Sequence, residues 1–436
     1  MAVLPEKFIE RMKKQLPENE WEAFFDVYHK KPLKGVRLNP LKGDRYALSS
    51  LLPFLGEPIA WEENGFYTGE EKLGASVWHF AGLFYSQEPS AMCAAPLLEV
   101  KGGERVLDLC SAPGGKGTQM ACRMNGEGLI VLNEPVFSRA KILSQNVERL
   151  GIKNAVVISE MPETLSKRFV GYFDKILVDA PCSGEGMFRK NAEEALSEWS
   201  EENVLMCAER QERILSEATK MLKVGGWLVY STCTFSEEED EGQVCDYLQK
   251  HPEMKLIKTE KIYPHKALGE GHFAALFEKT EKSEDADSLP VRIKEKKLSV
   301  TGESERAYRA FEKEFFKEKF AKRLFESKGI LYELPQEVFD WEGLQALRVG
   351  IRLGEVKNGR FEPSHSLAMC VKSADCKNVL HLQANDERIG KYLRGETLEG
   401  ELANGWCIVC VEGYPIGLGK AVNGTVKNHL PKGLRM

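Results

Sequence analysis

The spacing of apolar positions changes along the chain and separates it into regions of different predicted structure. Near the N-terminus, Phe8, Met12 and Leu16 recur at the spacing of an amphipathic helix. Residues 1–95 as a whole have a mixed, partly helical pattern, and we predict that they form an N-terminal domain. Between residues 96 and 282, short apolar runs alternate with helical patterns, which is typical of βαβ units around a parallel sheet. The pattern therefore predicts an α/β core.

The C-terminal part of the chain begins with a polar, acidic stretch at residues 280–290, from which we predict a linker over residues 283–300. A helical pattern follows, and we expect it to end at Gly329. From about residue 345 onward, short apolar runs are separated by Gly, Asn and Asp turns. Residues 301–436 are therefore predicted to form a helical segment and a small β-rich module. The apolar positions of the predicted helix are Tyr308, Phe311, Phe315, Phe316, Leu324 and Phe325.

Composition narrows the class of protein. Hydrophobic residues make up 42% of the chain and charged residues 29%, which suits a protein with buried cores and a charged surface. The N-terminus lacks the apolar centre of a signal peptide, and no apolar run approaches the roughly 18 residues that a membrane span needs. Eleven cysteines at irregular spacing do not resemble a disulfide framework. We expect a monomeric, cytoplasmic protein.

The distribution of charge leaves a nucleic-acid partner open. The formal net charge of -6, averaged over the chain, argues against nucleic-acid binding. Residues 30–45 and 413–436 are nevertheless basic. Basic runs are usually only solvated surface, so RNA contact is one of two interpretations. The basic residues concerned are Lys30, Lys31, Lys34, Arg37, Lys42 and Arg45 in the first run, and Lys420, Lys427, Lys432 and Arg435 in the second.

A glycine-rich turn follows the first predicted strand of the core, in the segment "ERVLDLCSAPGGKGTQMA". Ligands of α/β sheets bind at the carboxyl ends of strands, and glycines allow the backbone to approach a ligand closely. A P-loop is excluded because Lys116 is followed by Gly117 rather than by Ser or Thr, and a strict G-x-G-x-x-G is absent. Glu134 ends the next strand, where an acid suits ribose hydroxyls. The alternative is an ordinary turn with an exposed acid.

Two cysteines follow two later strands. The strand 173–178 leads into Asp179 and Cys182, and the strand 227–231 leads into Cys233. Consecutive parallel strands usually lie side by side, so we expect both thiols and the carboxylate at one edge of the sheet. A thiolate can add to an electron-poor carbon, and a carboxyl group can orient or donate a proton. A single cysteine at a strand end is usually a core residue, whereas two that converge favour a reactive site.

Three motifs resemble those of the Nop/Sun family of RNA cytosine-5 methyltransferases, and the bacterial RsmF-like branch fits best. They are "LDLCSAPGGKGTQ", "VDAPCSGEG" and "YSTCTFSEEEDE", supported by "GVRLNPLK", "GLFYSQEPSAM", "GEGHFAALFEK" and "VKNGRFEPSHSLAM". The resemblance implies a class I, Rossmann-like methyltransferase core between an N-terminal RNA-recognition domain and a C-terminal PUA-like RNA-binding module. It also implies S-adenosylmethionine as cofactor and a cytidine in RNA as target. Within this branch, 16S ribosomal RNA is favoured over transfer RNA.

The resemblance also implies roles for residues of the cofactor site. Residues 110–116 would hold the methionine end of the cofactor, and Glu134 its ribose. Glu160 would lie near the adenine, although the family often has Asp there. Together the implied cofactor-binding residues are Cys110, Ser111, Ala112, Pro113, Gly114, Gly115, Lys116, Glu134, Arg139, Glu160 and Asp179.

For the chemistry, the resemblance implies that Cys233 adds to C6 of the cytosine and that Asp179 hydrogen-bonds or protonates N3. Cys182 would assist breakdown of the adduct. Cytosine-5 DNA methyltransferases instead use the Pro-Cys cysteine as nucleophile, and this chain has both candidates. The alternatives are a transfer RNA or DNA cytosine-5 methyltransferase and a catalytically silent RNA-binding assembly factor.

The acidic run after Cys233 is interpreted as the start of a helix. Ser236 and Glu239 have the spacing of a capping box, and the other acids would lie in the first turn. The positive end of that helix would then favour the Cys233 thiolate. Cys407 and Cys410 have a metal-like spacing, but residues three apart on a strand face opposite sides, which predicts core packing and no metal site.

Overall fold

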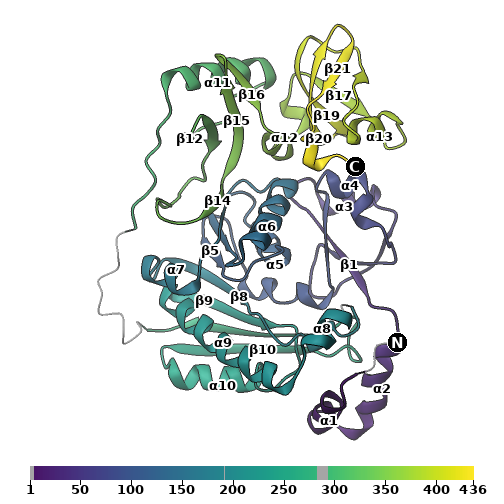
Figure 1. The fold of residues 1–436 in the computed structure, drawn as a ribbon, viewed down its shortest axis with the longest axis vertical. Coiled ribbons are helices and arrows are strands. Elements are labelled where there is room, and N and C mark those ends of the chain that lie inside the picture. Colours follow the sequence, from purple (N-terminus) through teal and green to yellow (C-terminus); the bar gives the residue numbers. More distant parts are fainter. Residues whose placement is uncertain (1–3, 191, 282–292) are drawn as a thin grey trace.

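The computed structural model describes residues 4–190, 192–281 and 293–436 (Figure 1). Two short helices, α1 (Glu6–Gln15) and α2 (Trp21–Asp26), begin the chain. Phe8 and Met12 are the buried residues of α1, as their helical spacing predicts. A small antiparallel sheet of strand order β2-β3-β1-β4 follows. The remaining elements of this region are β1 (Lys34–Leu38), α3 (Arg45–Ser50), β2 (Leu55–Pro58), β3 (Gly65–Thr68), α4 (Val77–Phe80) and β4 (Phe84–Gln87).

The predicted α/β core is confirmed and is built on an eight-stranded sheet of order β10-β11-β9-β8-β5-β6-β7-β14. The strands from β9 to β7 in this order are parallel, and the strands at both sides of them pair antiparallel. Strand bounds are β5 (Arg105–Asp108), β6 (Leu129–Asn133), β7 (Ala155–Ile158), β8 (Phe173–Asp179), β9 (Leu222–Thr232), β10 (Met254–Ile262), β11 (His272–Lys279) and β14 (Ala346–Val349).

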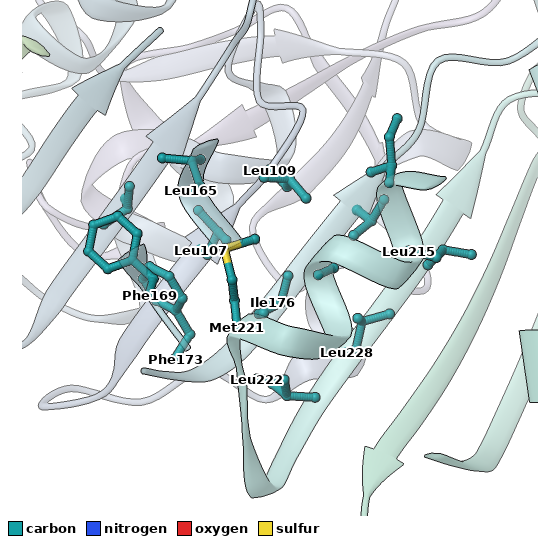
Figure 2. Close-up of a cluster of buried hydrophobic side chains, with 14 of the residues drawn as sticks. Leu107, Leu109, Leu165, Phe169, Phe173, Ile176, Leu215, Met221, Leu222 and Leu228 are labelled. Carbon is teal, nitrogen blue, oxygen red and sulfur yellow. The ribbon is translucent and has the colours of Figure 1, made fainter. Parts of the chain in front are cut away.

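Helices cover both faces of this sheet because successive residues of each buried strand point to opposite sides. Leu177 and Val229 pack in one buried cluster with residues of α5 (Gly115–Arg123) and α6 (Phe137–Leu150). Ile176 and Leu228 pack in the other cluster, with residues of α7, α9 and α10 (Figure 2). The helices of the second face are α7 (Pro162–Arg168), α9 (Glu201–Met221), which follows the short α8 (Ala192–Glu198), and α10 (Glu241–Lys250).

The periodic helix expected to reach Gly329 is shorter than predicted. The helix α11 (Gly302–Phe315) ends at Phe315, and Leu324 and Phe325 belong to strand β12 (Leu324–Ser327). The Glu312 carboxylate accepts backbone N–H groups from the chain that follows the helix, at 2.8 Å and 3.0 Å, and so holds that chain in a turn. Gly329, with φ of 75°, lies in the two-residue turn of the β12–β13 hairpin, where positive φ is required.

The C-terminal region contains two further sheets, of orders β12-β13-β15-β16 and β17-β19-β20-β21-β18. Cys407 and Cys410 lie on β19 and pack in different buried clusters, as the alternation of a strand predicts. Among the described residues, no helix has the length and apolar character to cross a membrane. The bounds are β13 (Ile330–Glu333), β15 (Ile351–Lys357), β16 (Arg360–Pro363), α12 (His365–Cys370), β17 (Val379–Leu382), α13 (Arg388–Leu393), β18 (Leu398–Glu399), β19 (Gly405–Val411), β20 (Tyr414–Val422) and β21 (Thr425–Asn428).

The C-terminal region packs on the rest of the molecule in two ways. Strand β14 pairs antiparallel with β7 and so extends the central sheet, although the sequence assigns residues 346–349 to the C-terminal part. Residues of β1, α3 and β4 share one buried cluster with residues of β17, β19 and β20, so the small N-terminal sheet packs against the C-terminal sheet (Figure 1). Most of the predicted linker, residues 283–292, lies outside the described residues.

The aromatic packing around Phe169 predicts that substitution at this position lowers stability. Phe169 is fully buried (Figure 2). The centroid of its ring lies 4.8 Å from that of Phe339, which comes from the C-terminal region. Phe169→Ala should lower the free energy of unfolding by about 3–5 kcal/mol, because it removes buried apolar area and leaves a cavity. Chemical denaturation would measure the change. Leu205→Ala is the control: this side chain is 56% exposed, and its loss should change stability by less than about 0.5 kcal/mol.

Candidate active site

The ends of β8 and β9 bring the predicted polar groups together. Asp179 pairs in register with Ser231, so the predicted adjacency of these strands is confirmed. The Ser231 hydroxyl donates to Asp179 Oδ1 at 2.8 Å, and Lys116 Nζ lies 2.8 Å from Asp179 Oδ2. Burial alone would raise the pKa of Asp179, but the charge of Lys116 and the hydrogen bonds hold it below its usual value. Asp179 is therefore an ionised carboxylate that joins the glycine-rich turn to the cysteine-bearing strands.

The two cysteine side chains are in contact at this edge. Cys182 Sγ and Cys233 Sγ lie 3.2 Å apart, and the Cys233 backbone N–H donates to Cys182 Sγ at 3.3 Å. The hydrogen bond to Cys233, together with burial, raises the pKa of Cys182 well above its ordinary value. Cys182 thus remains a thiol in contact with the Cys233 sulfur.

The loops that contain the two cysteines hold each other through reciprocal hydrogen bonds, which we call the loop clamp. Glu185, in the Cys182 loop, accepts the Phe235 backbone N–H at 3.0 Å. Glu239, in the Cys233 loop, accepts the Ser183 backbone N–H at 3.0 Å. Each loop therefore supplies a buried carboxylate to the other, and the position of each sulfur depends on both loops.

The predicted capping box at Ser236 and Glu239 is wrong. The helix α10 begins only at Glu241, and residues 237–240 form a turn. The Glu239 carboxylate accepts from the Ser183 N–H and not from the Ser236 N–H that a capping box requires, so the expected helix start next to Cys233 is not present. The physical reason is tertiary: the donor for Glu239 comes from another loop, which local spacing cannot reveal.

Burial changes the acidity of the acidic run. Asp240 accepts from the Thr232 hydroxyl at 2.6 Å and lies 2.9 Å from Lys261 Nζ. Burial raises the pKa of Glu239 to about 7 and that of Asp240 to about 8. Two of the acids after Cys233 are therefore internal parts of the site.

The glycine-rich turn is fixed by a residue of the N-terminal region. Arg37 is only 3% exposed, and it donates to the Gly115 carbonyl at 2.6 Å and to Thr118 Oγ1 at 2.8 Å. Lys42, also assigned to the first basic run, donates from Nζ to the Met369 carbonyl at 2.5 Å. These two cations have internal partners, so the basic run 30–45 is not uniformly solvated surface.

Close packing explains why glycine follows Lys116. A Cβ atom on Gly117 would lie 2.6 Å from Asp108 Oδ2 and 2.6 Å from Ser111 Oγ. Gly114 has a φ of 113°, which favours glycine at that position of the turn. The backbone of the turn is therefore held against the end of β5 and opens toward the same edge as Asp179.

The remaining predicted residues of the turn are held by their backbone groups. The Ser111 N–H donates to the Asn133 carbonyl at 2.8 Å, and the carbonyls of Ala112 and Pro113 accept from Arg139 at 3.0 Å and from Asn146 at 2.9 Å. Cys110 precedes this segment, and burial raises the pKa of its thiol well above the ordinary value. Cys110 is therefore an inert thiol at this edge.

Glu134 and Arg139 lie together beside the turn. Glu134 is buried at the end of β6, where its Oε1 accepts the Val136 N–H at 2.9 Å. Arg139 Nη1 lies 3.4 Å from Glu134 Oε2, and its other Nη donates to the Ala112 carbonyl. Arg139 thus connects the acid after the second strand to the glycine-rich turn.

Glu160 directs its carboxylate toward the residues that precede β14. Its backbone N–H and carbonyl bond to the Asn133 side chain at 3.1 Å and 3.0 Å, which fixes it beside the end of β6. Its carboxylate accepts the Gln345 N–H at 2.7 Å, just before β14. A role for Glu160 near an adenine stays a prediction.

Two buried polar residues at this edge were missed by sequence reasoning. Asp108 ends β5 and has no well-formed hydrogen bond within the described residues; burial raises its pKa to about 7. His272 begins β11, and burial lowers its pKa to about 3. Strand alternation places both on the sheet face of Asp179 and Ser231, but that inference requires the strand order, which the sequence does not provide.

The polar groups at this edge of the sheet fit S-adenosylmethionine. The buried carboxyl group of Asp108 and the Ser111 hydroxyl lie beside each other, and neither has a well-formed bond to another side chain among the described residues, so the pair suits a cationic amino group. Glu134, buried at the next strand end, suits a ribose. The acids therefore match the amine and the hydroxyls of this cofactor.

Comparison with known proteins assigns nearly the whole chain to one family. Residues 95–286 match the 16S rRNA methyltransferase RsmB/F family. The flanking regions match three domains of RsmF: its N-terminal domain at residues 4–89, its first C-terminal domain at residues 310–371 and its PUA domain at residues 379–436. The four matched segments follow one another along the chain without overlap.

Full-length relatives agree. The chain is 33% identical to ribosomal RNA small subunit methyltransferase F of Vibrio vulnificus strain YJ016, over 99% of this chain and 97% of that protein. It is also 33% identical to the protein of the same name from Shewanella sp. strain ANA-3, over 100% of this chain and 98% of that protein.

Two solved structures resemble about three fifths of this chain. A methyltransferase homologue from Pyrococcus horikoshii is 27% identical, with a TM-score of 0.55 over 61% of this chain and 92% of that one. NSun6 from Pyrococcus horikoshii, 23% identical, has the same fold, with a TM-score of 0.59 over 64% of this chain and 100% of that one. With the domain matches and the full-length identities, the chain belongs to the RsmF family of S-adenosylmethionine-dependent 16S ribosomal RNA methyltransferases.

Proposed function

We propose that this protein methylates C5 of a cytidine in 16S ribosomal RNA through a covalent adduct between Cys233 and C6 of the base. The observation that supports it most is the pair of sulfurs, 3.2 Å apart, beside the ionised carboxylate of Asp179. A thiol kept protonated next to a second sulfur suits a reaction that both forms and releases a thioether. The PUA domain at the C-terminus is consistent with an RNA substrate.

The proposed reaction begins at Cys233. C5 of cytosine is a poor nucleophile, and addition of the Cys233 thiolate to C6 makes C5 enamine-like. The Asp179 carboxylate, ionised beside Lys116, stabilises a proton on N3 and so makes C6 more electrophilic. When bound, S-adenosylmethionine supplies the electrophilic methyl group that C5 accepts.

Release of the product is assigned to Cys182. After methylation, water takes the C5 proton, the C5–C6 double bond forms again, and the bond between C6 and the Cys233 sulfur breaks with its electron pair on sulfur. The Cys182 thiol, whose pKa is raised, donates a hydrogen bond to the departing sulfur and so favours the elimination. The target base has to leave any stacked helix before it can reach this edge.

The substrate is tested by offering 16S ribosomal RNA, transfer RNA and DNA side by side with tritiated S-adenosylmethionine. We expect incorporation only into 16S ribosomal RNA, with bisulfite sequencing locating 5-methylcytidine. Preferred methylation of transfer RNA or DNA would contradict the substrate. Tight RNA binding without any incorporation would instead indicate a silent assembly factor.

Substitutions of the two cysteines should have opposite effects on the amount of covalent protein–RNA complex. Cys233→Ala removes the nucleophile, so it should abolish both methyl transfer and the covalent protein–RNA complex. Cys182→Ala should retain addition and slow release, so the complex should accumulate on denaturing gels after incubation with 16S ribosomal RNA and cofactor. Cys245→Ala, which changes an exposed cysteine, is the matched control and should behave as the wild type. If the two phenotypes were reversed, Cys182 would be the nucleophile and Cys233 would assist release.

The raised pKa of Asp108 predicts a pH-dependent affinity for the cofactor. We assign its carboxylate to the amino group of S-adenosylmethionine, which is cationic below about pH 7.5. With a pKa of about 7 in the free protein, ionisation rises between pH 6 and 7.5, and affinity should rise roughly five- to tenfold over that interval.

Calorimetric titration with S-adenosylmethionine measures this dependence. Asp108→Asn should bind S-adenosylmethionine weakly and lose most of the pH dependence. Glu163→Gln, at the start of α7, is the control and should leave the profile unchanged. An Asp108→Asn variant with the wild-type slope would show that another group titrates.

The loop clamp predicts that Glu239 acts through the position of the cysteines. Glu239→Ala leaves the Ser183 N–H without its acceptor, which should cost about 1–3 kcal/mol of stability. It should also reduce the rate of adduct formation with 16S ribosomal RNA while leaving cofactor affinity near normal. Glu237→Ala, which truncates an exposed neighbour, is the control. Equal adduct rates in the two variants would contradict a positioning role.

A further inference from the structure

His272 lies on the same sheet face as the proposed catalytic carboxylate. In the antiparallel pairing of β11 with β9, Phe273 is opposite Thr232 and Ala274 is opposite Ser231. Alternation along β11 puts His272 on the face of Ala274 and Ser231. His272 is thus the next residue of β11 on the face where the Ser231 hydroxyl bonds to Asp179.

The His272 imidazole is buried without a hydrogen-bond partner. The residue is 1% exposed, and neither ring nitrogen has a partner within the described part of the chain. Burying polar atoms without partners costs stability, so such a group requires a reason. Burial and the nearby Lys116 ammonium lower the pKa of His272 to about 3, although Asp179 opposes them, so the ring is neutral. It therefore has one nitrogen that donates and one that accepts.

The strand order places His272 on the side of the target base. Along the sheet, Glu134 follows β6, Asp179 ends β8, Cys233 follows β9 and His272 begins β11. The cofactor residues Asp108 and Glu134 lie at β5 and β6. Along the sheet, Asp179 and Cys233 therefore lie between the proposed ribose site at Glu134 and His272.

We propose that His272 is a specificity-determining residue, whose unprotonated ring nitrogen accepts a hydrogen bond from the exocyclic amine of the target cytosine. This inference rests on the proposed cytidine-C5 methylation. Uracil has a carbonyl at this position and cannot make the bond. A hydrogen-bond acceptor at this position therefore favours cytosine over uracil.

The other polar groups near Asp179 support this assignment. Lys116 and the Ser231 hydroxyl are donors, and both already bond to Asp179. Lys116 has further N–H groups that suit the O2 carbonyl of the base. Asp179 is assigned to N3. The amine of cytosine needs an acceptor, and the neutral imidazole provides one.

The test changes the His272 side chain and the exocyclic amine of the target base, separately and in combination. Once bisulfite sequencing has located the target, short RNAs are made with either cytidine or its pyrimidin-2-one analogue, which lacks the exocyclic amine. Single-turnover methyl transfer is measured with wild type, His272→Leu and His272→Gln. For each protein the rate on cytidine is divided by the rate on the analogue, and comparing these ratios between proteins cancels the intrinsic reactivity of the analogue.

The wild-type ratio should exceed that of His272→Leu by about tenfold, the effect of one hydrogen bond. His272→Gln retains an acceptor and should recover part of the ratio. The same ratio in wild type and in both variants would overturn the inference. If the wild type forms no 5-methylcytidine in any RNA, the proposed function fails instead, which keeps the two failures distinct.

Stability and cofactor binding provide independent readouts. Because the ring nitrogens have no partner among the described residues, His272→Leu should melt at the wild-type temperature or above it, and S-adenosylmethionine affinity should stay within about twofold. A fall in melting temperature with an unchanged ratio would indicate a structural histidine. If His272→Leu does not fold, the ratio for His272→Gln decides: a ratio below the wild-type value supports the inference, and the wild-type value overturns it.

Discussion

The parallel pairing of β8 with β9 is the constraint on which the site depends. It sets Asp179 opposite Ser231, and the loops that leave both strands then meet above this pair. Contact between the sulfurs, and the exchange of carboxylates between the loops, require this register. A slip by one residue would turn Asp179 to the other face of the sheet and separate it from Lys116.

The site concentrates buried polar groups that a purely structural protein would avoid. Asp108 and His272 lack well-formed partners within the described residues, and Glu239 and Asp240 have raised pKa values. Asp108 and His272 reduce stability unless a ligand or substrate bonds to them, whereas Glu239 and Asp240 accept hydrogen bonds within the protein. The extensive apolar packing on both faces of the sheet allows the fold to retain these groups. Figure 2 shows the cluster on one of these faces. Perturbed acids gathered at one strand edge are characteristic of a reactive site.

The site also depends on regions that precede and follow the core. Arg37 of the N-terminal region fixes the glycine-rich turn, and Gln345 bonds to Glu160 just before β14. Because they share a buried cluster, the N-terminal region and the PUA domain pack against each other.

The sequence by itself determined the α/β core, the glycine-rich turn and the convergence of Cys182, Cys233 and Asp179, because these follow from strand patterns and the adjacency of consecutive parallel strands. Only the tertiary structure decided which groups each side chain contacts. The end of α11 depends on the Glu312 carboxylate and the chain after the helix, and the role of Glu239 depends on Ser183. His272 belongs to the site only because β11 lies beside β9. Local patterns report the periodicity of neighbouring residues, whereas hydrogen-bond partners and burial come from segments far apart in the chain.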